Sequence, residues 1–126
     1  MNEIWKEIPG FEGHYEASNL GRVRSLERKI KQGNRWGQVV ERIQKSRILK
    51  PKNSQDGYHE ILLYLSGNRH YVRLHRIIAI TFLPNPNNKS QVDHKDSNKK
   101  NNNLSNLRWV TSKQNSEAAS ESGLLK

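Results

Sequence analysis

The middle of the chain alternates hydrophobic and polar positions in a way that predicts a β-hairpin. Residues 58–65 are rich in β-forming side chains, and residues 70–73 continue the same pattern after the sequence Ser-Gly-Asn-Arg at 66–69. Two-residue hairpin turns need backbone conformations with positive φ, and Gly67-Asn68 suits that requirement. We therefore expect two antiparallel strands joined by a tight turn.

The hydrophobic spacing then changes to that of a helix. Leu74, Ile77, Ile78 and Phe82 recur at helical intervals, and Leu83-Pro84 ends the pattern. His75 opens this helix, and we interpret it as a structural residue, or one close to a DNA backbone, rather than as a metal ligand.

The two flanking regions are more polar. Residues 1–26 carry signals of turns and short strands, and residues 27–46 predict either a long basic hairpin arm or a loop. Trp36, within that arm, is interpreted equally well as a packing anchor or as a DNA-facing aromatic residue.

Residues 84–106 are rich in asparagine, which is typical of a flexible loop, but apolar residues within and after this stretch argue against full disorder. We expect these residues to anchor a short hairpin: Val92, Leu104, Leu107, Trp109 and Val110.

A short helix is predicted to follow. Thr111 and Gln114 match the first and last positions of a capping box, so that a helix over residues 112–120 is expected.

Composition narrows the function classes. The chain has 126 residues, 33% of them hydrophobic, and no cysteine. Disulfides, zinc ribbons and thiol nucleophiles are thereby excluded. No apolar run is long enough to span a bilayer, and the N-terminus does not read as a secretory signal. We expect a soluble intracellular protein with one domain, or with a catalytic unit and a small appendage.

Charge points to a polyanionic partner. The formal net charge is +10, and residues 22–52 hold eleven basic residues against two acidic ones. An anionic membrane is the rival partner, but this segment lacks a sustained amphipathic helical period, so we favour nucleic acid. The predicted DNA-binding residues are Arg22, Arg24, Arg28, Lys29, Lys31, Arg35, Arg42, Lys45, Arg47, Lys50 and Lys52.

Four residues could carry hydrolytic chemistry. Asp93 and Asn115 offer oxygen ligands, which suit Mg²⁺ or Mn²⁺ better than zinc. His94 can accept a proton from an attacking water, and the amide oxygen of Asn106 could hold the other ring nitrogen of His94. Adjacent strand residues point to opposite faces, so the strand must end or distort at residues 93–94 if both are to serve one site.

Two ordered motif sets resemble a known family. Residues 75–79 (HRIIA), 92–98 (VDHKDSN), 102–111 (NNLSNLRWVT) and Asn115 resemble the HNH nuclease domain of phage intron-encoded homing endonucleases. Residues 5–15 (WKEIPGFEGHY), 18–19 and 21–25 (GRVRS) resemble the module that often precedes that domain. Together the two sets span nearly the whole chain, which makes chance agreement improbable.

The resemblance implies an α+β fold, in which a small antiparallel β module precedes a ββα-metal nuclease domain. We expect a basic DNA-binding module at residues 1–57 and the nuclease domain at 58–126, with its core at about 90–120. By position, the resemblance implies Asp93 and Asn115 as ligands of one Mg²⁺ or Mn²⁺, His94 as general base and Asn106 as the residue that orients it.

The expected activity is nicking of double-stranded DNA by a monomer, in the cytoplasm of a bacterial host, by a phage- or prophage-encoded enzyme of the homing type. Two alternatives remain open: an accessory phage nickase for packaging or for degrading competing DNA, and an inactive DNA-binding regulator.

Overall fold

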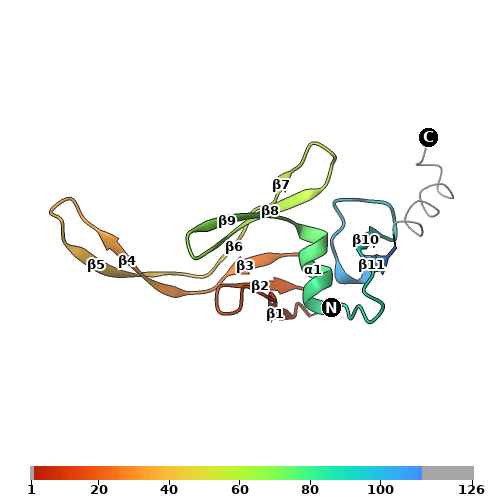
Figure 1. Cartoon of the computed structure of the whole chain (residues 1–126), viewed down its shortest axis with the longest axis horizontal. Coiled ribbons are helices and arrows are strands. Elements are labelled where there is room, and N and C mark those ends of the chain that lie inside the picture. The colour runs from red at the N-terminus through yellow and green to blue at the C-terminus, as the bar shows by residue number, and fades with distance from the viewer. Residues whose placement is uncertain (1, 112–126) are drawn as a thin grey trace.

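A computed structural model describes residues 2–111 of the chain. Antiparallel sheets make up most of this part, together with one α-helix and one short 3₁₀ turn (Figure 1). This is the α+β class predicted from the sequence. The predicted capping box beyond Thr111, the helix over residues 112–120 and Asn115 lie outside the described residues.

The front of the chain forms a four-stranded sheet. Its strands are β1 (Trp5–Glu7), β2 (Tyr15–Ser18), β3 (Val23–Ser25) and β6 (Arg47–Ile48), hydrogen-bonded in that order. Strand β2 is the most buried of them, with Tyr15, Ala17 and Ser18 inside. The short strands and frequent turns agree with the turn-rich pattern of residues 1–26.

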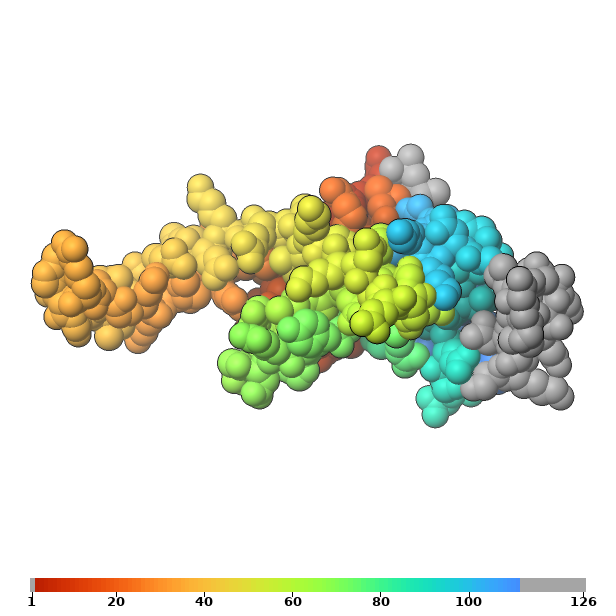
Figure 2. Space-filling model, turned by 90° about the horizontal axis from the view of Figure 1, so that it is seen from above, coloured from red at the N-terminus to blue at the C-terminus, as the bar shows by residue number. Residues whose placement is uncertain are grey.

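Between β3 and β6 the chain leaves the body as a two-stranded arm. Strands β4 (Arg28–Gly33) and β5 (Val39–Gln44) pair only with each other in the described structure. The arm projects from one end of the molecule (Figures 1 and 2). Of the two alternatives for residues 27–46, the hairpin arm is therefore correct.

The predicted central hairpin and helix are both present. Strands β8 (His59–Leu65) and β9 (Asn68–Arg73) pair from Glu60–Arg73 to Leu65–Asn68, and β7 (Lys52–Asn53) pairs with the start of β8. Helix α1 (Leu74–Phe82) follows β9 directly. The turn differs in one respect. The two loop residues with positive φ are Ser66 (52°) and Gly67 (79°), because Asn68 already pairs with Leu65.

The asparagine-rich region contains a second, smaller hairpin. Strand β10 (Gln91–His94) pairs with β11 (Leu107–Val110), and a 3₁₀ turn, η1 (Leu104–Asn106), leads into β11. Val92, Leu107 and Val110 are buried, as expected of anchoring residues, whereas Leu104 and Trp109 are partly buried.

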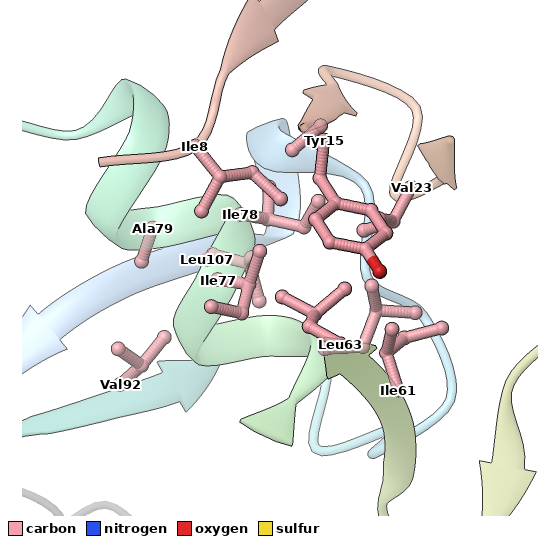
Figure 3. Packing of buried hydrophobic residues seen from close by; sticks show 12 residues of the cluster. Ile8, Tyr15, Val23, Ile61, Leu63, Ile77, Ile78, Ala79, Val92 and Leu107 are labelled. Carbon is pink, nitrogen blue, oxygen red and sulfur yellow. The ribbon is translucent and has the colours of Figure 1, made fainter. Parts of the chain in front are cut away.

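One hydrophobic core joins these parts. The apolar face of α1, with Ile77, Ile78 and Ala79, packs against residues from the front sheet, from β8 and from both strands of the β10–β11 hairpin (Figure 3). Tyr15 crosses this core, and its hydroxyl accepts a hydrogen bond from the backbone N–H of Tyr64 at 3.0 Å. Residues before and after position 57 therefore belong to one core, which fixes the front sheet relative to the β10–β11 hairpin.

Candidate active site

Asp93 lies on β10 opposite Arg108 of β11. The Arg108 Nε–H donates to Oδ2 of Asp93 at 2.9 Å, and a second guanidinium nitrogen lies 2.8 Å from the same oxygen. The Asp93 side chain is only 16% exposed. A negative charge in this half-buried position is therefore balanced by a neighbouring cation, and Oδ1 receives no hydrogen bond from any described residue.

His94 is the last residue of β10 and faces the interior. Its exposure is 5%, and its Nε2 lies 2.9 Å from the side-chain oxygen Oδ1 of Asn102. An amide oxygen only accepts hydrogen bonds. The neutral ring must therefore carry its proton on Nε2, which leaves the lone pair on Nδ1 available to take a proton.

Asn102 is itself held in place. It is 5% exposed, and its Nδ2 lies 3.5 Å from Nδ1 of His59 and 3.4 Å from the backbone oxygen of Lys100. Burial, followed by the nearby charges of Lys100 and His94, lowers the pKa of His59. A neutral His59 can accept from the Asn102 amide, so that the amide oxygen is directed at His94.

The ring of His94 also packs against aromatic side chains. The ring centroids of His75 and His94 are 4.9 Å apart, and Tyr58 stacks on His75 with centroids 5.0 Å apart and an interplanar angle of 18°. Burial, followed by repulsion from His94, Arg73 and Arg76, lowers the pKa of His75 to about 3. His75 is thus a buried neutral packing residue, which agrees with its interpretation as structural.

The hydrogen bonds of the Asn106 side chain go to residues other than His94, contrary to the prediction that its amide would hold the ring. Its Oδ1 accepts from the backbone N–H of Asp96 at 3.1 Å, and its Nδ2 donates to Oδ1 of Asp96 and to the backbone oxygen of Asn101, both at 2.9 Å. Asn106 therefore closes the loop that follows β10. The sequence suggested an orienting amide, but the run of asparagines gave no signal that Asn102 rather than Asn106 supplies it.

The loop carrying Asn102 rests on the front sheet. The backbone N–H of Leu104 donates to the oxygen of Asn19 at 2.9 Å. Gly21 has a φ of +86°, and a Cβ at that position would stand 2.6 Å from the backbone oxygen of Asn102. Only glycine fits this contact, because any side chain would push the loop away.

The described residues contain one of the two predicted metal ligands, Asp93. No group of three or more His, Asp or Glu residues within the described part of the chain could hold a metal ion alone. Asp93 presents a carboxylate oxygen without a described donor, which fits a hard cation such as Mg²⁺ or Mn²⁺. The second predicted ligand, Asn115, lies outside the described residues.

The predicted DNA-binding cations fall into three sets. Arg22 and Arg24 form ion pairs with Glu3 and Glu16, and the Arg24 guanidinium lies 4.2 Å from the ring centroid of Trp5. These two arginines stabilise the front sheet. The second set lies on the arm, and none of its members takes part in an ion pair found among the described residues. It consists of Arg28, Lys29, Lys31, Arg35, Arg42 and Lys45.

The third set lines a groove of about 600 Å³ between β6, β7 and the β8–β9 hairpin. Arg47, Lys50 and Lys52 are on one side, and Tyr64 and Tyr71 complete the wall. Tyr64 is 42% and Tyr71 60% exposed. Exposed cations beside exposed aromatic rings are typical of a nucleic-acid-binding surface.

Comparison with known families agrees with this geometry. Residues 3–64 match the NUMOD4 motif, and residues 72–117 match an HNH endonuclease domain. The chain therefore carries a NUMOD4 motif ahead of an HNH endonuclease domain, which confirms the resemblance seen in the sequence.

Individual relatives are also similar. DNA endonuclease I-HmuI of Bacillus phage SP01 is 41% identical over 121 residues, which are 96% of this chain and 60% of that protein. An uncharacterised HNH endonuclease of Acanthamoeba polyphaga mimivirus is 43% identical over 70 residues, 56% of this chain and 21% of the relative. The chain thus spans less than two thirds of the length of either relative.

A solved structure shares the fold. The structure titled "DNA binding and cleavage by the HNH homing endonuclease I-HmuI" superimposes with a TM-score of 0.74 at 39% sequence identity. The match covers 98% of this chain and 61% of that chain.

No helix among the described residues is both long and apolar enough to cross a membrane.

Proposed function

We propose that this chain is a metal-dependent DNA endonuclease that nicks one strand of double-stranded DNA, leaving a 3′-hydroxyl and a 5′-phosphate. The observation that carries the proposal is the pairing of His94 with Asn102 beside Asp93, at the end of a β-strand in an HNH domain. A protein that only bound DNA would need neither a held imidazole nor the adjacent half-buried carboxylate.

In this proposal His94 is the general base. The hydrogen bond from Nε2–H to Asn102 fixes both the tautomer and the ring plane, and packing against His75 restricts rotation of the ring. Nδ1 then takes a proton from the water that attacks phosphorus. Asn106 contributes indirectly, because it closes the loop from which Asn102 reaches His94.

Asp93 and Asn115 would hold one Mg²⁺ or Mn²⁺. HNH nucleases are generally metal-dependent, and an oxygen donor set favours these ions. When bound, the ion supplies Lewis acidity and stabilises the departing 3′ oxygen. Arg108 neutralises Asp93 and keeps the carboxylate in a defined orientation on the strand.

Duplex DNA would lie along the basic surface of the module at residues 1–57, while residues 58–126 carry the nuclease chemistry. The arm and the groove lined by Arg47, Lys50 and Lys52 supply the cations for phosphate contact. One Asp93 and one His94 make one site, which cuts one phosphodiester, so a monomer is expected to nick rather than to break both strands.

The biological role proposed is that of a phage-encoded homing-type enzyme acting in the cytoplasm of a bacterial host. The relation to I-HmuI of a Bacillus phage supports this role over genome packaging or degradation of competing DNA.

A plasmid assay tests the activity. Supercoiled plasmid incubated with the full chain and Mg²⁺ should become open circles before linear molecules form, and DNA ligase should reseal those circles. Run-off sequencing then maps the break to one strand. Linear product appearing first at limiting enzyme would contradict the monomeric nickase, and intact plasmid across a range of target sequences would contradict the endonuclease itself.

A further inference from the structure

Two side chains at the start of β8 reach the surroundings of His94. Both Tyr58 and His59 belong to the part of the chain that matches the NUMOD4 motif, residues 3–64, and the HNH match begins only further along the chain. The ring centroids of Tyr58 and His94 are 6.0 Å apart. Nδ1 of His59 lies 3.5 Å from Nδ2 of Asn102. Groups from the NUMOD4 part of the chain therefore lie beside His94 and beside its hydrogen-bond partner.

The direction of the His59 side chain follows from the alternation of β8. Side chains two residues apart share a face of a strand. His59 therefore lies on the same face as Ile61 and Leu63, which are 2% and 0% exposed. The turn before the strand is closed by the backbone N–H of Ser54, which donates to the oxygen of Tyr58 at 2.8 Å. His59 is thus held at the edge of the core, on the face of the strand that packs into it.

The Asn102 amide has two acceptors for its N–H groups. An amide nitrogen can donate two hydrogen bonds, and its partners are Nδ1 of His59 and, at 3.4 Å, the backbone oxygen of Lys100. Lys100 is only two residues from Asn102 in the same loop, so it moves together with the amide. His59 is 43 residues away on a strand that packs in the core, so it holds the amide against the body of the protein.

A second contact connects the same loop to the turn before β8. Nζ of Lys99 donates to the backbone oxygen of Asp56 at 2.9 Å and lies 4.7 Å from the ring centroid of Tyr58. Lys99 is exposed, whereas Asn102 is 5% exposed. Losing a hydrogen-bond partner costs more for a buried polar group than for an exposed one. The contact with His59 is therefore the one whose loss should displace the amide.

We propose that His59 is a positioning residue for the nuclease reaction: it holds Asn102, and Asn102 in turn holds His94. This role rests on the proposed function of His94 as general base, and it means that the NUMOD4 part of the chain completes the active site of the HNH domain. Because Nδ1 of His59 accepts from an amide, the neutral ring carries its proton on Nε2. Burial, followed by the charges of Lys100 and His94, lowers the pKa of His59 and so favours this neutral form.

Nuclear magnetic resonance of the imidazole nitrogens tests the contact in the wild-type chain. The protein has five histidines, and isotope-labelled rings show which nitrogen carries the proton. At neutral pH in EDTA, the ring of His59 should be protonated on Nε2 and not on Nδ1. The His59 signals are assigned by their loss in His59→Asn. A protonated Nδ1 would overturn the proposal, because that atom could then donate but not accept.

Substitutions of His59 test its effect on the reaction. His59→Ala should slow single-turnover nicking of supercoiled plasmid in Mg²⁺ by about tenfold or more, with unchanged gel-shift affinity in EDTA. His59→Asn should recover much of the rate, because its amide oxygen, like Nδ1, is bonded to Cγ and can accept. His59→Leu fills a similar space without an acceptor and should remain slow. His70→Ala, at an exposed histidine of β9, is the control and should match the wild type.

Combining variants shows whether His59 acts through Asn102. In an Asn102→Ala background, His59→Ala should cause no further loss of rate, because residues in one hydrogen-bonded network are not additive. Rate losses that multiply would overturn the proposal. So would equal rates for His59→Asn and His59→Leu, a pair that decides the matter if His59→Ala does not fold, or a wild-type rate in His59→Ala. If the wild-type chain does not nick plasmid, the proposed function fails instead.

Discussion

The side-chain oxygen of Asn102 lies 2.9 Å from Nε2 of His94, and both residues are almost completely buried. This hydrogen bond links strand β10 to a loop that the front sheet supports, and it determines which ring nitrogen of the neutral His94 carries the proton.

Replacing His94 by alanine should abolish most cleavage but preserve DNA binding. A general base typically contributes about 10²- to 10⁴-fold to a rate, and His94 acts on the water rather than on the phosphate backbone. Single-turnover nicking and gel-shift titration measure the two effects, with the exposed His70→Ala as the matched control. A variant within a few-fold of the wild-type rate would exclude the role.

Asn102 is expected to act as a positioning residue. Asn102→Ala removes the acceptor and should slow cleavage by about tenfold or more, in the range typical of groups that support a functional residue. Asn102→Asp keeps an acceptor and should recover part of the rate. A carboxylate beside the ring favours the protonated imidazole, so the acidic limb of the rate-against-pH curve should move to higher pH. Identical pH profiles for wild type and Asn102→Asp would contradict the contact.

Metal removal should stop the reaction. EDTA should abolish nicking, and Mg²⁺ or Mn²⁺ should restore it. Asp93→Ala should not be rescued by moderate metal concentrations, because a charged ligand is lost, whereas Asn115→Ala should raise the metal requirement less severely. Glu12→Ala, an exposed carboxylate in the front module, is the control. Full activity without metal would rule out the mechanism.

The salt dependence of DNA binding should separate paired from unpaired arginines. Each phosphate neutralised contributes about 0.9 to the slope of log affinity against log salt. Arg35→Gln and Arg47→Gln should each lower that slope. Arg24→Gln should leave it nearly unchanged and instead reduce thermal stability, because Arg24 is bound to Glu16 and stacked on Trp5. Equal slopes for all three variants would remove the distinction.

Stability should decrease as the pH falls from about 6.5 towards 3. The pKa of His75 in the folded protein is about 3 because burial, and then the neighbouring charges, oppose protonation. In this interval the unfolded chain binds a proton that the folded chain does not, so acid favours unfolding by up to about 1.4 kcal/mol per pH unit. Urea denaturation at several pH values measures this slope, and His75→Phe should flatten it. An equally steep slope in His75→Phe would assign the effect to other groups.

The local sequence patterns predicted the elements well. The helix at Leu74–Phe82 and the hairpin before it follow from spacing and turn residues, and the anchoring residues of the second hairpin are buried as expected. Residues 27–46 were ambiguous because a solvent-exposed ribbon needs no apolar alternation, so both a loop and an arm agree with the sequence.

The site was predictable only in part. Asp93 and His94 stand out as adjacent residues with suitable chemistry. The identity of the amide that contacts His94, however, depends on how the twelve-residue connection between β10 and β11, residues 95–106, closes. Asn106 and Asn102 are chemically identical and both are buried, so only their hydrogen-bond partners distinguish them. Similarly, the pairing of Arg22 and Arg24 with carboxylates depends on long-range strand register that spacing does not reveal.

Gly21 has a consequence for how such proteins can be recombined. A Cβ at this position would stand 2.6 Å from the backbone oxygen of Asn102. The front module and the HNH domain therefore depend on each other for the position of the loop that carries Asn102. A chimaera that joins this HNH domain to a foreign N-terminal module should keep its chemistry only if the donor also supplies a glycine at this point, so positions 21 and 102 are expected to be inherited together.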